Sequence, residues 1–134
     1  MKYIKNIPRK SINHVVAAPL ILSLIAPLII TDIWIEVYHR IAFPLYGIDI
    51  VPRSRYIKID RVKLKYLNPM QRIYCVYCGY ANGALQYWVK IVGETEAYWC
   101  GIQHQKDPKF VPPKHHEDFI EYGDKDGFDK FYKK

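Results

Sequence analysis

The stretch VVAAPLILSLIAPLIITDIWI, residues 15–35, decides the fold because it is almost wholly apolar. Its 21 residues match the roughly 20 that a helix needs to cross a bilayer. Charge begins only at Asp32 and no small-residue cleavage site follows, so the pattern is typical of a retained membrane anchor and not of a cleaved signal peptide. A buried core helix of a soluble protein is the alternative interpretation of the same apolarity.

Two prolines interrupt this stretch. Pro19 and Pro27 each lack the backbone N–H that would bond the preceding turn, so we predict a kink at one or both. Basic residues lie on both sides of the stretch, and the positive-inside rule is therefore nearly tied. These residues are Lys2, Lys5, Arg9 and Lys10 before it, and Arg40, Arg53 and Arg55 after it. Both a single tilted span and a re-entrant insertion fit this pattern.

The net charge of +7 is concentrated at the two flanks, with +4 in residues 1–14 and +6 in residues 51–75. A basic belt beside an apolar segment predicts contact with a bilayer that carries anionic headgroups. Residues 105–134 are neutral and offer little basic surface to follow a phosphate backbone, which argues against nucleic acid. The chain has no G-x-S-x-G, G-x-G-x-x-G or Walker-type motif, which argues against serine hydrolases and nucleotide-binding folds.

Three ionisable residues follow the apolar run at helical spacing. Asp32, Glu36 and His39 stand at i, i+4 and i+7 and share one face of a continuous helix at the membrane boundary. Glu36-x-x-His39 has the spacing of helix-borne ligands in dimetal bundles, but such a site needs a second motif that this chain lacks. We favour local pairing with Arg40 and headgroup water over an enzyme built on these groups, and we assign no catalytic residue.

The cysteines and one histidine form the pattern C-x2-C-x21-C-x3-H. Three thiols cannot complete a disulfide set within one chain, whereas Cys3His is a standard tetrahedral zinc set. A tight turn at C-x2-C would aim two thiolates at one ion, with Gly79 placed to allow that turn. We predict that Cys75, Cys78, Cys100 and His104 bind zinc, with iron as the alternative metal. A redox disulfide between Cys75 and Cys78 is the alternative without a metal.

Weaker patterns fill the rest of the second half. Residues 85–92 predict an amphipathic helix that Gly93 ends, and residues 55–67 fit a strand or a helix equally well. Residues 106–124 predict an irregular wrap, in which His115 and His116 compete with His104 as ligands or lie on the surface. Residues 124–134 predict a short terminal helix with Phe128, Phe131 and Tyr132 on one side.

Two known families share parts of this pattern. Residues 73–80, Ile-Tyr-Cys-Val-Tyr-Cys-Gly-Tyr, resemble the first metal knuckle of rubredoxins, although Cys100 and His104 stand where rubredoxins carry a second C-x2-C. Three thiolates and one imidazole also resemble the ligand set of the membrane-anchored CDGSH-type [2Fe-2S] proteins. The whole chain is similar to a small bacterial membrane-associated family with Cys-Gly-Tyr-Ala-Asn-Gly and Tyr-Trp-Cys signatures, which implies no particular activity.

These features together predict an α+β chain. A basic tail (1–14) precedes a kinked or re-entrant membrane-associated helical segment (15–50), a basic connector (51–74) and a rubredoxin-like or zinc-ribbon-like metal-binding domain (75–134). The expected function is a membrane-anchored accessory protein with a structural zinc, serving as a partner of a larger membrane complex. A rubredoxin-like iron electron carrier for a membrane-bound oxidoreductase is the alternative. Reduced thiols favour the cytoplasmic face of the inner membrane.

Overall fold

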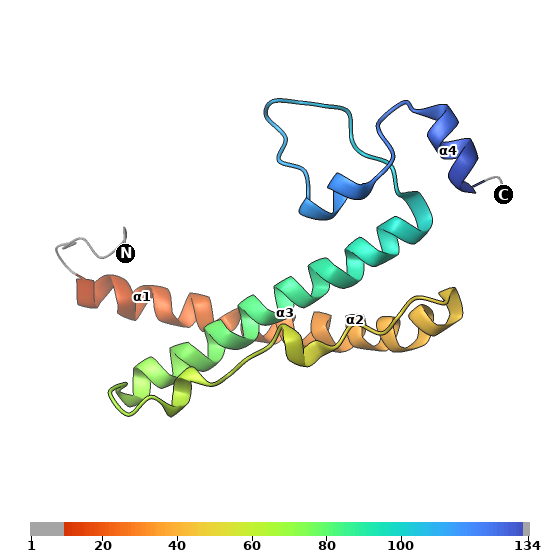
Figure 1. Ribbon diagram of the computed structural model, residues 1–134. Coiled ribbons are helices and arrows are strands. Elements are labelled where there is room, and N and C mark those ends of the chain that lie inside the picture. The colour runs from red at the N-terminus through yellow and green to blue at the C-terminus, as the bar shows by residue number, and fades with distance from the viewer. Residues whose placement is uncertain (1–9, 133–134) are drawn as a thin grey trace.

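The computed structural model describes residues 10–132, and all the regular elements in that range are helical. Two N-terminal helices follow each other almost in line, and a third long helix crosses them (Figure 1). The elements in chain order are α1 (Lys10–Ser23), α2 (Ile25–Tyr46), the 3-10 turns η1 (Arg53–Arg55) and η2 (Arg61–Lys63), α3 (Pro69–Cys100), the 3-10 turn η3 (Lys114–Asp118) and α4 (Lys125–Tyr132).

The predicted α+β fold with a rubredoxin-like or zinc-ribbon-like domain is wrong. Residues 10–132 contain no strand, apart from an isolated parallel bridge between Ile102 and Ile120. The segment predicted to form the first metal knuckle lies inside α3 instead. The reason is local: Asn68 accepts a hydrogen bond from the Gln71 N–H (2.8 Å), and the Gln71 side chain accepts one from the Asn68 N–H (3.0 Å). This capping box starts a helix that no later proline interrupts.

The two helices predicted for the second half of the chain are both present. The helix predicted over 85–92 is present but extends at both ends into the 32 residues of α3, and Gly93 does not end it. Residues 55–67 form neither a strand nor an α-helix and hold the end of η1 and the 3-10 turn η2, whereas the predicted terminal helix forms as α4. The residues flanking the apolar stretch at 1–9 lie outside the described range, including Lys2, Lys5 and Arg9.

A break between α1 and α2 divides the apolar stretch at Leu24. Pro27 has no N–H to donate to the Ser23 carbonyl. The backbone forms a tighter turn there, in which the Leu24 N–H donates a hydrogen bond to the Ile21 carbonyl (3.3 Å). Pro19 stays inside α1, so the interruption belongs to Pro27 alone. Residues Val15–Tyr46 together form one helical stretch that is long and apolar enough to cross a membrane.

The core lies where α2, α3 and the segment between them meet. Phe43, Val51, Tyr87 and Ile91 are buried together. Residues 51–65, which we call the strap, return beside α2 and pack against α3 (Figure 1). A Cβ added at Gly83 would lie 2.6 Å from a strap carbonyl oxygen, so the missing side chain is what lets the strap backbone reach α3.

Candidate functional site

The structure does not bring the four predicted metal ligands together. Cys75 and Cys78 lie in the first half of α3, and Cys100 is its last residue. At 1.5 Å of rise per residue, Cys75 and Cys100 are about 37 Å apart along the helix axis. All three cysteines are free thiols. His104 lies past the end of α3, where its ring centroid is 5.3 Å from that of His116. One ion cannot bind the predicted set in this conformation.

A polar network joins α2 to α3 around Asp32. Its carboxylate is 6% exposed and accepts hydrogen bonds from both terminal nitrogens of Arg53, one of them at 2.8 Å. The Tyr80 hydroxyl (2.8 Å) and the Trp88 indole N–H (2.9 Å) also donate to it. Burial and the hydrogen bond to the carboxylate raise the pKa of Tyr80 to about 12. Four donors surround this buried charge, and removing one of them would leave it poorly compensated. We call the contacts of Asp32 with Arg53, Tyr80 and Trp88 the latch, because they join α2 to α3.

Glu36 and His39 belong to the same seam and are also fully engaged. The Tyr87 hydroxyl lies 2.7 Å from a Glu36 carboxylate oxygen and 3.0 Å from His39 Nδ1. The Val51 N–H donates to His39 Nε2 (3.0 Å), so Nε2 is an acceptor and Nδ1 must carry the proton that reaches Tyr87. Arg40 holds the second Glu36 oxygen at 2.8 Å. Because their side chains are already hydrogen-bonded within the protein, Glu36 and His39 have a structural role here.

A second titratable cluster forms where η3 meets the last turns of α3. Glu96 accepts from His115 Nε2 (2.8 Å) with one carboxylate oxygen and from His116 Nε2 (3.1 Å) with the other. The three ligand atoms all lie within 4.8 Å of one another. Partial burial opposes ionisation of Glu96, but the hydrogen bonds from both imidazoles outweigh it and hold its pKa below the usual value. We call Glu96, His115 and His116 the His/Glu cluster.

Local chain geometry explains why this cluster forms. Backbone hydrogen bonds from Gln103 N–H to the Ile120 carbonyl (2.8 Å) and from Ile120 N–H to the Gly101 carbonyl (2.9 Å) close the ends of the loop. Gly93 admits the His115 ring, because a Cβ there would lie 3.1 Å from its Cγ and Nδ1. The closed loop therefore presses η3 onto α3 one turn from Glu96.

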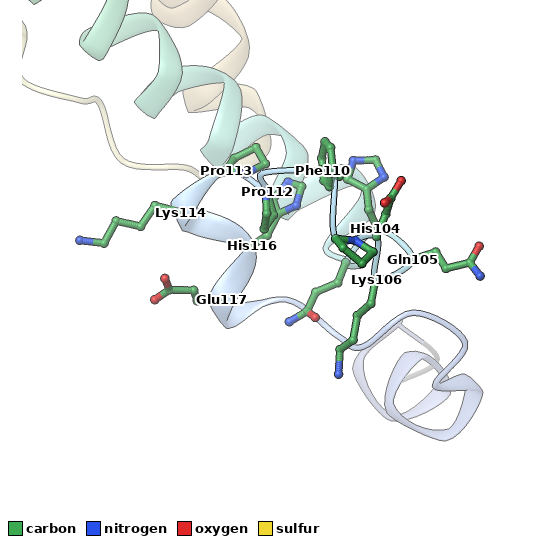
Figure 2. A pocket seen from close by; sticks show the side chains of 12 residues that line it. His104, Gln105, Lys106, Phe110, Pro112, Pro113, Lys114, His116 and Glu117 are labelled. Carbon is green, nitrogen blue, oxygen red and sulfur yellow. The ribbon is translucent and has the colours of Figure 1, made fainter.

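His116 carries an unsatisfied polar atom. Its side chain is 4% exposed, and its Nδ1 has no hydrogen-bond partner within the described part of the chain. Its ring stacks on Phe119 with 4.9 Å between centroids. His116 also lines a pocket of about 600 Å³ with His104 and Phe110, and Figure 2 shows these side chains around it. A buried imidazole nitrogen without a hydrogen-bond partner costs stability.

Searches against protein-family models, curated proteins and solved structures find no match for this chain. Two imidazoles and a carboxylate are a ligand set that suits zinc and related transition metals. The sequence analysis did not identify Glu96 as a candidate ligand. Two signals were present: Glu96 lies one helical turn before Cys100 of the Tyr-Trp-Cys signature, and His115 and His116 are adjacent to each other. What the sequence analysis lacked was the return of the loop that brings residues 19 and 20 positions later back to Glu96.

Proposed function

We propose that this chain is a membrane-anchored accessory protein whose C-terminal part binds a zinc ion at the His/Glu cluster. The observation that carries the proposal is the convergence of three ligand atoms within 4.8 Å at the end of α3. Donors bound about 2.1 Å from one tetrahedral zinc lie about 3.4 Å apart. The two contacts of Glu96, at 2.8 and 3.1 Å, need only a small expansion to admit the ion.

The apolar stretch Val15–Tyr46 supports the membrane anchor. Three free thiols, one of them the exposed Cys100, support a reducing compartment and hence the cytoplasmic face of the inner membrane. The structural use of Glu36 and His39 favours a role as partner of a larger membrane complex over catalysis. An iron electron carrier would need its thiolates at one ion, and their spacing along α3 gives that alternative no support.

The test is metal analysis of protein purified in mild detergent and loaded with zinc. Wild type should bind one equivalent, and His116→Ala and Glu96→Gln should each weaken zinc binding by more than the roughly 10- to 100-fold that loss of an outer partner of a ligand produces. The matched control replaces Cys75, Cys78 and Cys100 with Ser and should keep the full zinc content. Far-UV circular dichroism of each variant confirms that α3 still forms.

Two outcomes would contradict the proposal. If the triple serine variant lost zinc and His116→Ala kept it, the ligands would be the cysteines and not the His/Glu cluster. No zinc binding by folded wild type at micromolar free zinc would remove the metal altogether.

A further inference from the structure

One face of α2 is apolar and exposed along most of the helix. Its members recur at helical spacing from residue 30 to residue 45, and exposure reaches 75% for Trp34 and 78% for Leu45. We call this set the α2 stripe: Ile30, Ile33, Trp34, Val37, Ile41 and Leu45. At 1.5 Å per residue the stripe is about 22 Å long. Exposed apolar surface of this extent marks contact with lipid or protein.

The opposite face of α2 packs against the rest of the protein. Asp32, His39 and Phe43 are buried there against α3 and the strap. The strap runs antiparallel to α2, since Val51 meets His39 and Arg53 meets Asp32. Figure 1 shows the strap returning beside α2 towards the start of α3. The stripe therefore faces away from both of its neighbours.

The strap is strongly basic along its length. It carries six basic residues against the single acid Asp60, and the Lys58 side chain is 80% exposed. The six are Arg53, Arg55, Lys58, Arg61, Lys63 and Lys65. Because Arg53 meets Asp32 near the start of the stripe, this positive charge begins there and continues beside the first half of α3, where the Lys58 carbonyl oxygen approaches Gly79.

If the stretch Val15–Tyr46 crossed the bilayer, it would carry this charge into the hydrocarbon. Leu24 at the break and Leu28 of α2 line one pocket with Tyr77 and Ala81 of α3, so the first half of α3 lies beside the first turns of α2. The exposed Arg72 lies on that same half of α3, and η2 packs against α3 as well. The first turns of α2 lie near the middle of Val15–Tyr46, so exposed charges level with them would meet hydrocarbon, where they are tolerated only in a protein interior or a water-filled cavity.

We infer that α2 lies in the plane of the bilayer, with the α2 stripe in the hydrocarbon of one leaflet and the strap on the water side among anionic headgroups. A helix with one apolar and one charged side binds a membrane interface in this way. The basic residues of the strap complement lipid phosphates. The inference rests on the membrane part of the proposed function and is independent of the zinc site.

Depth measurement tests this placement. In the background with all three cysteines replaced by Ser, single cysteines at Ile30, Val37 and Leu45 sample the stripe, and Lys58→Cys samples the strap. Each carries an environment-sensitive fluorophore, and the protein is reconstituted in phosphatidylcholine vesicles containing phosphatidylglycerol. Quenching by lipids labelled at shallow and deep positions should give one common depth for the three stripe sites. The Lys58 site should be quenched from the water.

Three other outcomes would overturn the inference. Depth that changes steadily from Ile30 to Leu45, which are about 22 Å apart along α2, would mean that α2 crosses the bilayer. Stripe labels shielded from both lipid and aqueous quenchers would mean that a protein covers the stripe. Folded protein that fails to float with vesicles would end the membrane anchor itself, which separates that failure from the other two.

A charge experiment tests the headgroup contact. Replacing Lys58 or Lys63 with Gln should each weaken binding to anionic vesicles about fivefold, the fold-change expected for one basic residue near the surface. Binding to vesicles of phosphatidylcholine alone should not change. Equal loss on both vesicle types would show that the strap does not contact anionic headgroups.

Discussion

Replacing Arg53 with methionine removes the cation that faces the buried Asp32. The guanidinium supplies two of the four hydrogen bonds to that carboxylate, while Tyr80 and Trp88 supply the other two. Methionine keeps the aliphatic bulk of the side chain. The variant therefore leaves a buried charge with two neutral donors and no opposite charge.

The expected loss in free energy of unfolding depends on how exposed Asp32 and Arg53 are. Removing one partner of a fully buried ion pair costs about 3–5 kcal/mol. Here Asp32 is 6% exposed, but the Arg53 side chain is 32% exposed and two neutral donors remain, so we expect about 2–3 kcal/mol. At about 4 °C per kcal/mol for a chain of this size, the midpoint should fall by about 10 °C.

Thermal unfolding in detergent, followed by far-UV circular dichroism, measures this loss. The matched control is Arg40→Ala, whose side chain is 61% exposed and pairs with Glu36; because an exposed ion pair contributes little to stability, it should lower the midpoint much less than Arg53→Met does. Adding Asp32→Asn to Arg53→Met should recover part of the stability, because the uncompensated charge is gone. Equal midpoints for Arg53→Met and Arg40→Ala, or strictly additive effects in the double variant, would refute the latch.

Three further predictions follow from particular contacts. Gly83→Ala should lower stability by about 1–2 kcal/mol in chemical unfolding, despite the better helix propensity of alanine, because its Cβ would lie 2.6 Å from the strap backbone. Burial and the hydrogen bond to Asp32 raise the pKa of Tyr80 from 10.0 to about 12. The stabilisation from its protonated hydroxyl is therefore complete below pH 10.0 and is lost as the pH rises towards 12. The difference in free energy of unfolding between wild type and Tyr80→Phe should shrink over that range. Maleimide should label the exposed Cys100 before the half-buried Cys75 and Cys78, and added chelator should not change the rates.

Sequence reasoning found the elements that depend on local signals. The apolar run identified α1 and α2, and the lack of an N–H at Pro27 explains the break at Leu24. Spacing alone gave the wrong structure at Cys75 and Cys78, because the i, i+3 spacing is shared by the ligand pair of a metal knuckle and by neighbours on one face of a helix. The capping box at Asn68 and the long proline-free run after it were the signals that distinguish the two.

The His/Glu cluster shows what a sequence leaves undetermined. His115 and His116 could be proposed as competing ligands, but their partner Glu96 is brought to them by backbone pairing across the loop and by the absence of a side chain at Gly93. Such long-range contacts depend on the path of the whole loop and leave no periodic trace. Histidine and carboxylate content could nominate candidates, and only the fold could select among them.

The Cys-Gly-Tyr-Ala-Asn-Gly signature gains a different explanation from the fold. Gly79 and Gly83 stand one turn apart on α3, where Cβ atoms would lie 3.0 and 2.6 Å from strap carbonyl oxygens. Tyr80 between them donates to Asp32 on α2, and Ala81 is small and buried. A glycine that follows Cys78 to turn the backbone towards sulfur would need no second glycine at this spacing. The signature therefore marks the contact that joins α3 to the strap and α2, and this contact holds the basic strap beside the first half of α3.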